Sequence, residues 1–501
     1  MAIAALTLAL GAATTVAAGP ASAASTWPGK PSGVRVSGAG NSWLTVSLRS
    51  AVHARSYRLF ASTTKSDIYY DNLIHGRHSS ARHTATSSRP SLSLHGMRYT
   101  SAPIYYRVVA LNGSKASYSA GIGQTALRPA TPWSLTVHTS AAGTYLTWGS
   151  QAATGYTIAT ATNSSMTAGR RNFSIIDQSH AFTPSGLTKG VRYYFTVRAL
   201  NGSMPSHYAG IVSAVVQSRQ QSMRLMSYNI LNLGADRTRE AGGVVAPWSQ
   251  RRAPAVALIK SANPDVVGIQ EGNWWADATH HILQVDSLRN GLGGTYTLAH
   301  TEPRYGESDW KWFRTGNYIL YKPSTYRAVG AGGNWHLGAK AYAVYQVLQN
   351  KASGARVLVV NTHLTQPGGY SNDLARQSEM RSMVSGANAR AHGLPVVYVG
   401  DFNSNNNPKQ YRLDGPGSIM RSSRIADARL VAQSHVNPHW DSANDYMRAP
   451  YHYDLYIDYL CLTPGVSATS WGMAMRMSHG RFVGTIPSDH NPIWTQLQFP
   501  Y

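Results

Sequence analysis

The sequence predicts a multidomain chain, with two all-β sandwiches followed by a larger α+β domain built of layers. Three observations predict this fold class. The chain has 501 residues, 43% of them hydrophobic, which is enough for about three or four packed domains. A strand-like segment at 106–114 recurs 89 residues further on, at the spacing of a domain-sized repeat. Beyond residue 222, apolar runs alternate with helix-like segments, as they do in layered domains.

Residues 1–23 are expected to be a Sec signal peptide rather than part of the fold. They carry no charge, contain an apolar run at 3–10 and end in Ala21-Ser22-Ala23, a typical cleavage site. A membrane anchor would need about 20 strongly apolar residues, and no later segment is long and apolar enough to span a bilayer. We therefore expect a secreted, extracellular protein, with association with the cell wall left open. Because no basic residue precedes the apolar run, the true translation start is also left open.

The chain is strongly basic, with 45 Lys and Arg residues against 22 Asp and Glu, a formal charge of +23 and a pI near 10.1. This balance favours polyanionic partners, namely nucleic acid, anionic phospholipid or an acidic cell-wall polymer. Before residue 222 there are 19 basic and three acidic residues, so most of the excess lies on the first half. Docking on a polyanion and solubility alone both remain open. The one cysteine, Cys461, excludes an intrachain disulfide and a cysteine-based zinc cluster.

The first half contains two related β modules. Segments 106–114 and 195–203 are near copies that alternate apolar and polar side chains, and both contain the turn signal Asn-Gly. Further short strands are expected at 118–123, 145–148, 155–158 and 208–215. Short strands at this spacing predict β-sandwiches.

These two modules resemble fibronectin type III domains. The module at 129–217 carries the fuller match, with Trp148 in an early strand and Tyr193 at the place of the family's tyrosine corner. The module at 27–127 departs from both features and is the weaker match. The resemblance implies modules that space or bind rather than catalyse.

The chemistry is expected in a third domain at 222–499, reached through a polar linker at 218–222. In this domain, polar side chains stand at the ends of apolar strand-like runs in six places along the sequence, and in the last of them they precede the run. The ends of strands in one sheet system can converge on one cleft, so this order predicts a site. The polar residues at these ends are Asn229, Glu271, His363, Asp401 with Asn403, Asp458, and Asp489 with His490.

These residue types suit metal-assisted attack of water on a phosphate ester. Asn229, Glu271, Asp401 and Asp489 offer hard oxygen ligands, which suit Mg²⁺ or Mn²⁺ and also fit Ca²⁺. The histidines can carry protons near neutral pH, and Asn403 can donate to a phosphoryl oxygen. Metal, base, acid and neutral donor are what in-line hydrolysis requires. The sequence has no glycine-rich loop of the Walker type, so no nucleotide cofactor is expected.

The third domain resembles the endonuclease/exonuclease/phosphatase superfamily, which has the DNase I-like fold. Seven motifs carry the resemblance, in the family's order. They are Ser227-Tyr228-Asn229, Pro264-Asp265-Val266-Val267 with Gln270-Glu271, Gly316-Asn317-Tyr318, Asn361-Thr362-His363, Gly400-Asp401-Phe402-Asn403, Ile457-Asp458-Tyr459 and Ser488-Asp489-His490. The resemblance implies a four-layered αββα sandwich with its cleft at one edge of two packed sheets.

The resemblance also implies roles for the matching residues. Glu271 is the expected principal metal ligand, with Asn229 and Asp489 as further metal-site residues. Asp401 and Asn403 are expected to orient or deprotonate the attacking water and to hold the phosphate.

The two histidines of the motifs have separate expected roles. Asp458 orients His490, which contacts the phosphate or acts as base, so the general base stays open between Asp401 and His490. His363 is expected on the phosphate or leaving-group side. Asp454 is a rival for the role of Asp458, which we prefer because the residues after it fit the motif. The choice between one metal ion and two is left open.

The substrate is less well specified. Segment 302–314 interleaves basic and aromatic residues just before Asn317. The candidate substrate contacts are Asn317, Arg304, Lys311 and Arg314. Such a segment suits a nucleic-acid backbone with stacked bases, an amphipathic hairpin against a membrane, or an ordinary loop over the core.

We therefore expect a secreted, divalent-metal-dependent phosphodiesterase, in first place an extracellular nuclease. Its basic charge and its secretion favour nucleic acid over other substrates. A phospholipid phosphodiesterase of the sphingomyelinase type, or another phosphatase, would use the same catalytic frame. The least favoured hypothesis is a non-catalytic wall-binding protein, because such a protein would not need the complete set of site residues. Residues 222–501 alone are expected to keep activity on a soluble substrate.

Overall fold

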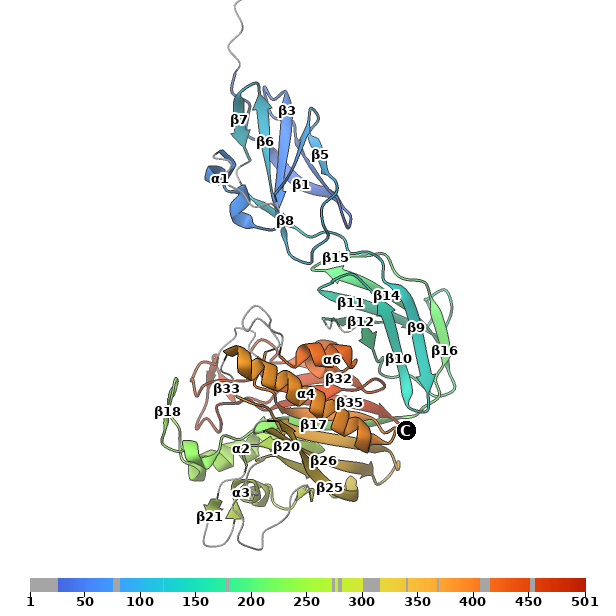
Figure 1. Cartoon of the computed structure of the whole chain (residues 1–501), viewed down its shortest axis with the longest axis vertical. Coiled ribbons are helices and arrows are strands. Elements are labelled where there is room, and N and C mark those ends of the chain that lie inside the picture. The colour runs from blue at the N-terminus through green and yellow to red at the C-terminus, as the bar shows by residue number, and fades with distance from the viewer. Residues whose placement is uncertain are drawn as a thin grey trace, which may run out of the picture. The chain divides into compact units, whose positions relative to one another are not determined.

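The computed structural model describes residues 26–74, 82–119, 121–176, 178, 180–272, 275–277, 282–300, 316–338, 341–366, 369–405, 415–450 and 456–501. The expected signal peptide at 1–23 lies outside these residues, as do Arg304, Lys311, Arg314 and Asp454. The chain divides into two compact units, Met1–Leu127 and Arg128–Tyr501 (Figure 1).

The first unit is a β-sandwich. One sheet has the order β1 (Ser32–Ala39), β2 (Leu44–Arg49), β5 (Ser91–Leu94). The other has the order β4 (His83–Ser87), β3 (Ser56–Ser62), β6 (Ile104–Asn112), β7 (Lys115–Tyr118), with β8 (Gly123–Thr125) also on β6. Two short helical turns, η1 (Lys65–Ile68) and α1 (Tyr70–Ile74), follow β3. Alternate residues of β6, including Tyr106, Val108 and Ala110, are buried, as the predicted strand periodicity requires.

The second unit begins with a sandwich of the same arrangement. One sheet has the order β13 (Ala181–Phe182), β10 (Gly143–Gly149), β9 (Trp133–Ser140). The other has the order β12 (Arg171–Ile175), β11 (Gly155–Ala161), β14 (Arg192–Asn201), β15 (Met204–Pro205), with β16 (Val212–Val215) also on β14. The repeated segments form β6 and β14, which hold equivalent places in their sheets. The structure confirms that this part of the chain is β-rich, while the fibronectin type III identity stays a prediction.

The expected strands are found with changed bounds. Strand β10 contains the predicted strand at 145–148, and β11 contains the one at 155–158. Less of the segments at 118–123 and 208–215 is in strands than expected. In the first segment, pairing to β6 ends at Tyr118 and resumes only at Gly123. In the second segment, only β16, at its end, pairs with β14.

The rest of the second unit contains two larger sheets. The first has the order β23 (Thr297–Leu298), β24 (Tyr318–Tyr321), β20 (Val266–Gln270), β17 (Gln220–Asn229), β35 (Ile493–Pro500), β32 (Ser467–Met473), β30 (Ser434–Val436). The second has the order β25 (Tyr326–Gly338), β26 (Ala341–Asn350), β27 (Arg356–His363), β28 (Val396–Asp401), β31 (Asp458–Leu462), β29 (Ala426–Asp427).

Helices cover the outer faces of these two sheets. Helices α2 (Trp248–Ala262) and α3 (Gln284–Gly291) pack on the first sheet, where Ile259 and Leu288 share a core cluster with Val267. Helices α4 (Gly369–Ala391) and α6 (Gly417–Ser422) pack on the second sheet, where Met383 shares a cluster with Tyr398. The shorter elements are η2 (Leu233–Ala235), α7 (Ala428–Val431), β18 (Arg239–Glu240), β19 (Gly243–Val244), β21 (Trp275–Asp277), β22 (Ile282–Leu283), β33 (Met477–Ser478) and β34 (Arg481–Phe482).

A third apolar cluster fills the space between the two sheets. Leu225 and Val266 of the first sheet share it with Val359, Val397 and Leu460 of the second. These strands bury both faces, which explains why they read as continuous apolar runs in the sequence. The order of layers is therefore helices, sheet, sheet, helices, and the predicted four-layered αββα sandwich is confirmed (Figure 1).

The segment 218–222 is not a linker, contrary to the sequence-based expectation. Strand β17 already begins at Gln220, which pairs with Pro500 of β35. One residue earlier, Arg219 and Tyr501 exchange backbone hydrogen bonds of 3.1 and 3.0 Å. The chain thus passes directly from the second sandwich into the central strand of the first large sheet.

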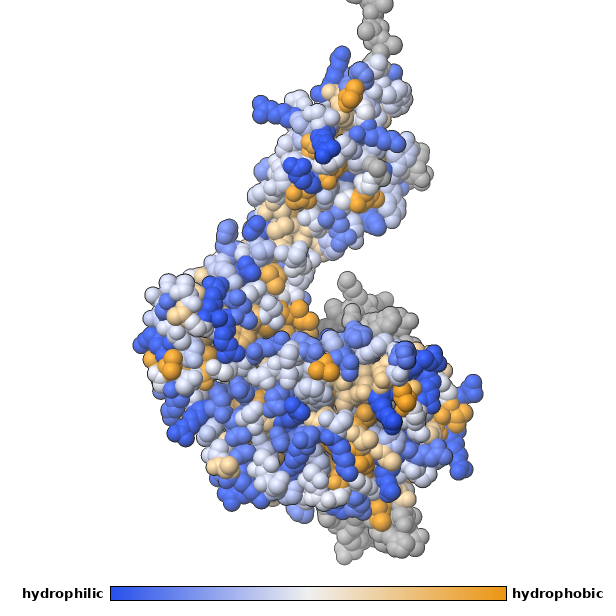
Figure 2. Space-filling model, turned by 180° about the vertical axis from the view of Figure 1, so that it is seen from behind, coloured by the Kyte–Doolittle hydropathy of each residue, from blue (hydrophilic) through white to orange (hydrophobic). Residues whose placement is uncertain are grey.

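On the face shown in Figure 2, hydrophilic residues cover most of the surface and apolar residues lie among them. Within the part of the chain that the structure describes, no helix combines the length and apolar character needed to span a bilayer.

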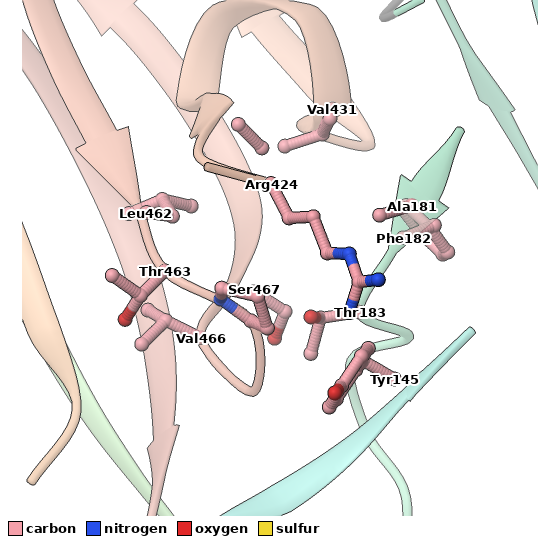
Figure 3. A pocket seen from close by; sticks show the side chains of 12 residues that line it. Tyr145, Ala181, Phe182, Thr183, Arg424, Val431, Leu462, Thr463, Val466 and Ser467 are labelled. Atoms are coloured by element: carbon pink, nitrogen blue, oxygen red, sulfur yellow. The ribbon is translucent and has the colours of Figure 1, made fainter. Parts of the chain in front are cut away.

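The second sandwich and the layered domain meet in a seam with direct contacts. The Gly465 N–H donates to Thr183 Oγ1 at 3.0 Å, and the Gly186 N–H donates to Gln498 Oε1 at 2.9 Å. Phe182 of the sandwich and Val466 of the layered domain belong to one buried cluster. Figure 3 shows the seam around a small cavity of about 20 Å³, where the Arg424 side chain extends toward the sandwich.

Candidate active site

The parallel strands of the two large sheets end at the same edge. In the first sheet, β17 and β20 run parallel with Asn229 beside Gln270, so Asn229 and Glu271 emerge together. In the second sheet, β27 and β28 run parallel with His363 beside Asp401. Because the sheets are stacked, these four side chains meet at one edge of the sandwich.

Two antiparallel strands begin where the parallel strands end. Strand β31 starts at Asp458, directly beside Asp401 in the ladder. Strand β35 runs antiparallel to β17, so Asp489 and His490, which precede it, arrive at the Asn229 end. The topology therefore brings together residues that lie up to about 260 positions apart in the sequence.

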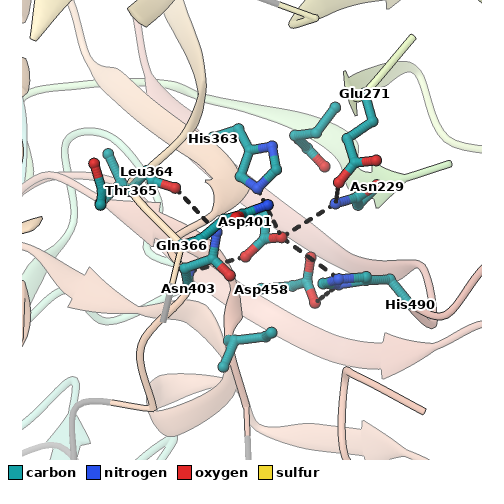
Figure 4. A network of polar contacts seen from close by, with 12 residues as sticks. Asn229, Glu271, His363, Leu364, Thr365, Gln366, Asp401, Asn403, Asp458 and His490 are labelled. Carbon is teal, nitrogen blue, oxygen red and sulfur yellow. Dashed lines mark hydrogen bonds and ion pairs between the residues drawn. The ribbon is translucent and has the colours of Figure 1, made fainter. Parts of the chain in front are cut away.

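Asp401 is the centre of the polar network (Figure 4). Its Oδ2 lies 3.1 Å from Asn229 Nδ2, 3.3 Å from His363 Nε2 and 3.5 Å from His490 Nε2. Its Oδ1 accepts the Asn403 backbone N–H at 2.9 Å. The residue is only 1% exposed, so this carboxylate is fixed in place by its partners on every side.

Behind Asp401, Asp458 and His490 form a buried pair. The distance between Asp458 Oδ2 and His490 Nδ1 is 2.8 Å, which leaves His490 Nε2 directed at Asp401. Burial lowers the pKa of the His490 imidazole, but the charges of Asp458, Asp401 and Asp489 outweigh it, so the pKa is held well above 6.5. The His490 ring thus has one carboxylate at Nδ1 and a second one facing Nε2.

Glu271 is held by two asparagines. Asn229 Nδ2 donates to one carboxylate oxygen at 3.0 Å, and the backbone and side chain of Asn232 donate to the other. Burial raises the pKa of Glu271, but the His363 charge and these hydrogen bonds outweigh it and lower the pKa overall. Glu271 also has a φ of 64°, in the left-handed region that few non-glycine residues adopt, directly after β20.

The carboxylates at this edge suit a divalent cation. Burial and the nearby charges of Glu271 and Asp401 raise the pKa of Asp489 to about 6, although His490 opposes the shift. Like charges this close are relieved by a bound cation, and carboxylate oxygens are the ligands that Mg²⁺ and Mn²⁺ prefer. Asp401, Asp458 and His490 also offer three ligand atoms within 4.8 Å of one another, and this set differs from the predicted metal set of Asn229, Glu271 and Asp489.

The asparagines expected in the site have well-defined contacts. Asn229 accepts the Leu231 N–H at 3.0 Å through its Oδ1, so its amide nitrogen faces the carboxylates. Asn403 donates to the Leu364 carbonyl oxygen at 3.0 Å, and Asn317 is buried and donates to the Tyr342 carbonyl oxygen at 3.0 Å. Their proposed metal-binding, phosphate-binding and substrate-binding roles stay predictions.

Three residues that the sequence did not point to brace the site. Asn232 holds Glu271, as described above. Ser442 Oγ accepts the backbone N–H of Asp458 at 3.1 Å. Asn444 donates from its backbone to the Asp489 carbonyl oxygen at 2.6 Å and from its side chain to the Ser488 carbonyl oxygen at 3.1 Å. These residues lie in irregular segments without a motif, so no local signal in the sequence could have found them.

Comparison with known proteins agrees with this architecture. The family model described as the Endonuclease/Exonuclease/phosphatase family matches residues 226–490. A search of the curated proteins finds no match.

Solved structures of low sequence identity also match the chain. An endonuclease/exonuclease/phosphatase from Bacteroides vulgatus is 21% identical with a TM-score of 0.43, over 55% of this chain and 98% of its own. The Bacteroides thetaiotaomicron mannosyl-6-phosphatase Bt3783 is 16% identical with a TM-score of 0.41, over 55% and 99%. D. rerio TDP2 complexed with single strand DNA product is 16% identical with a TM-score of 0.36, over 55% and 98%.

Proposed function

Because the chain belongs to the endonuclease/exonuclease/phosphatase family, whose members are phosphoesterase hydrolases, we propose that it is a secreted, metal-dependent nuclease. The observation that carries this proposal is the position of Asp401, one carboxylate oxygen of which faces His363, His490 and Asn229 at once. The basic charge of the chain favours a nucleic-acid substrate, and the sequence of residues 1–23 favours secretion.

The roles of the two catalytic side chains follow from their positions. His490 is held by Asp458 at Nδ1, and the nearby carboxylates favour its protonated form, so its Nε2 donates to a non-bridging phosphate oxygen and stabilises the charge that develops there. Asp401 then accepts the proton of the attacking water, because it is the carboxylate that both histidines face. Asp458 holds the His490 ring with Nε2 on the side of Asp401, where a bound phosphate would lie beside both groups.

His363 stands on the other side of Asp401 and is partly exposed. From this position it donates to the phosphate or to the leaving oxygen. Glu271 and Asp489 would hold Mg²⁺ or Mn²⁺, with Asn229 beside them. When bound, the cation supplies Lewis-acid stabilisation of the negative charge on the phosphate.

The test is one set of assays on four substrates: supercoiled plasmid, RNA, sphingomyelin vesicles and bis-p-nitrophenyl phosphate. Each is incubated with Mg²⁺, Mn²⁺ or EDTA. We expect metal-dependent nicking of plasmid or cleavage of RNA, and a loss of about 10²–10⁴-fold in His490→Ala. His95→Ala, which removes an exposed histidine of the first unit, is the matched control and keeps full activity.

Two outcomes would contradict the proposal. Release of phosphocholine from vesicles without cleavage of nucleic acid would assign the site to phospholipid. Absence of hydrolysis of every substrate, by protein whose cooperative unfolding shows that it is folded, would show that the site does not hydrolyse phosphodiesters.

A further inference from the structure

Two arginines of the second sandwich lie over one tyrosine ring. Arg198 Cζ is 4.8 Å and Arg170 Cζ is 5.6 Å from the centroid of the Tyr208 ring. Arg170 Nη2 also donates to the Tyr208 hydroxyl at 3.4 Å. Arg170 Nε donates to Asn172 Oδ1 at 3.4 Å and its Nη1 donates to the Met166 carbonyl oxygen at 3.3 Å. The second N–H on each Nη atom is left for a further acceptor, because a guanidinium that lies on an aromatic face keeps its edge N–H groups in one plane.

This group lies on the outer face of the sheet of β11, β12 and β14. Phe195, Val197 and Ala199 of β14 point into the core, so Arg198 between them points to the opposite face. A separate cluster of Ala159, Ala161 and Met166 underlies this face, with Tyr194 and Tyr208 packed against it. Arg198 is thus held on a strand of the sheet, while Arg170 and Tyr208 come from irregular segments beside it.

The first unit has the same kind of face. Arg107, which also comes from the central strand, lies with its Cζ 5.7 Å from the Tyr118 centroid. Lys65 Nζ lies 5.9 Å from the Tyr105 centroid. Arg107 donates to the Ser119 carbonyl oxygen through Nε and Nη2, which fixes its guanidinium plane. A cation over a tyrosine therefore recurs on the equivalent sheet of both modules, from different sequence positions.

The charge on these faces has few acidic partners within the modules. Residues 128–217 contain six Lys and Arg residues and one acidic residue, Asp177, which lies outside the residues that the structure describes. Residues 26–127 contain 12 Lys and Arg residues and two Asp, of which Asp67 is buried. The surplus of positive charge on both modules is complementary to an external polyanion.

We propose that these two faces bind the nucleic-acid substrate, with phosphates against the guanidinium edges and bases beside the tyrosine rings. The inference rests on the proposed function and names residues outside the catalytic edge that bind the same polymer. Planar, bidentate N–H groups match phosphate oxygens, and aromatic rings stack with any base, so the contact is independent of sequence. Two such faces on one chain raise the affinity for long polymers more than for short ones.

Binding is measured by fluorescence anisotropy with a labelled oligonucleotide of about 20 nucleotides, on the full chain in EDTA. One variant combines Arg170→Gln with Arg198→Gln, and a second combines Lys65→Gln with Arg107→Gln. The matched control combines Arg327→Gln with Arg356→Gln, which removes the same charge at the end of the second large sheet opposite His363. Circular dichroism checks that each variant is folded.

We expect either pair of substitutions at the tyrosine faces to raise Kd about tenfold or more and to reduce the salt slope by about 1.4, which corresponds to two phosphate contacts on a single strand. Hydrolysis of bis-p-nitrophenyl phosphate should stay unchanged, because the catalytic edge is intact. An equal change in the control pair, or no change in both test pairs, would overturn the proposal.

Polyphosphate of the same phosphate content is the second probe. We expect it to compete at least about tenfold less well than the oligonucleotide, because it has no bases to stack. Equal competition would overturn the nucleic-acid assignment in favour of a general polyanion such as a wall polymer. If the oligonucleotide binds at these faces and no nucleic acid is cleaved, the proposed function fails while this inference stands.

Discussion

At the scale of single residues, the hydrogen bond between Asp458 and His490 is the most sensitive contact of the site. Asp458→Asn keeps the shape of the side chain but removes the charge that holds the His490 proton. We expect kcat to fall about 10²–10⁴-fold, with KM and the melting temperature changed much less. Steady-state kinetics with bis-p-nitrophenyl phosphate measure this.

Asp427→Asn is the matched control for that prediction. Asp427 is also a buried carboxylate of the second large sheet, but it caps α7 by accepting the Arg429 N–H at 2.9 Å. Asparagine caps helices about as well as aspartate, so activity and stability should stay near those of the native protein. Equal losses in both variants would show that the loss in Asp458→Asn comes from removing a buried charge in general.

Asn232 is predicted to set the affinity for the metal ion rather than the rate of the chemical step. Its side chain and backbone hold one oxygen of Glu271, so Asn232→Ala frees that carboxylate to rotate. We expect the Mg²⁺ concentration for half-maximal activity to rise about 10–100-fold, with kcat at saturating Mg²⁺ nearly unchanged. A fall in kcat with no change in the Mg²⁺ requirement would contradict this role.

The sequence identified the proposed catalytic residues better than the residues that hold them in place. Asp458 was preferred over Asp454 from its motif, and it is the residue that contacts His490. Ser442 and Asn232 act through hydrogen bonds made possible by the fold, and polar residues in irregular segments give no signal of such contacts. Motifs identify the residues that take part in the reaction. The hydrogen bonds that hold these residues in place depend on distances between segments that are remote in sequence.

At the scale of elements, the two large sheets are joined by a buried amide network as well as by apolar packing. Asn361 of β27 donates to the Ile269 and Tyr318 carbonyl oxygens at 2.8 and 2.9 Å, and it accepts from Gln270 Nε2 at 2.7 Å. Asn361 is fully buried, so water does not reach these groups to replace the hydrogen bonds. The motif residue therefore has a structural role, between the sheets rather than in the site.

Asn361→Ala should lower the free energy of unfolding by at least about 3 kcal/mol. The substitution removes a buried hydrogen bond from each of two carbonyl oxygens, at about 1–3 kcal/mol each, and leaves a cavity where the amide was. Gln270 Nε2 keeps only its longer contacts to Ser227 Oγ and the Gly268 carbonyl oxygen. Urea unfolding followed by tryptophan fluorescence measures the change, and Lys351→Ala at an exposed position should change it by less than about 0.5 kcal/mol. A similar stability for the two variants would show that the network does not hold the sheets together.

The prediction of elements was correct where a local pattern was enough. Apolar runs that end in polar residues marked β17, β20, β27 and β28, because strands between two layers are apolar on both faces. The segment 218–222 was wrongly expected to be a linker, because its polar composition suggests a loop. It pairs with β35 instead, and the hydrogen bonds of that ladder come from residues about 280 positions away, which no local pattern can show.

At the scale of the whole molecule, the seam argues that the second sandwich is part of the folded unit of the catalytic domain. Leu146 and Phe182 of the sandwich share one buried cluster with Val431, Val466 and Ala468 of the layered domain. Backbone contacts also cross the seam, including the Ile176 N–H to the Leu430 carbonyl oxygen at 3.2 Å. These contacts oppose the sequence-based expectation that residues 222–501 act alone.

Two truncations test this view of the molecule. Residues 128–501 keep the whole second unit and should unfold at the same temperature as that unit does in the full chain. Residues 218–501 keep β17 entire but lose the sandwich, which exposes the apolar side of the seam. We expect their melting temperature to fall by at least about 5 °C, which corresponds to the loss of roughly 2 kcal/mol or more in a domain of this size. Differential scanning calorimetry compares the two, with hydrolysis of bis-p-nitrophenyl phosphate as the check on the site. An unchanged melting temperature and full activity in residues 218–501 would show that the sandwich only adjoins the catalytic domain and adds nothing to its stability.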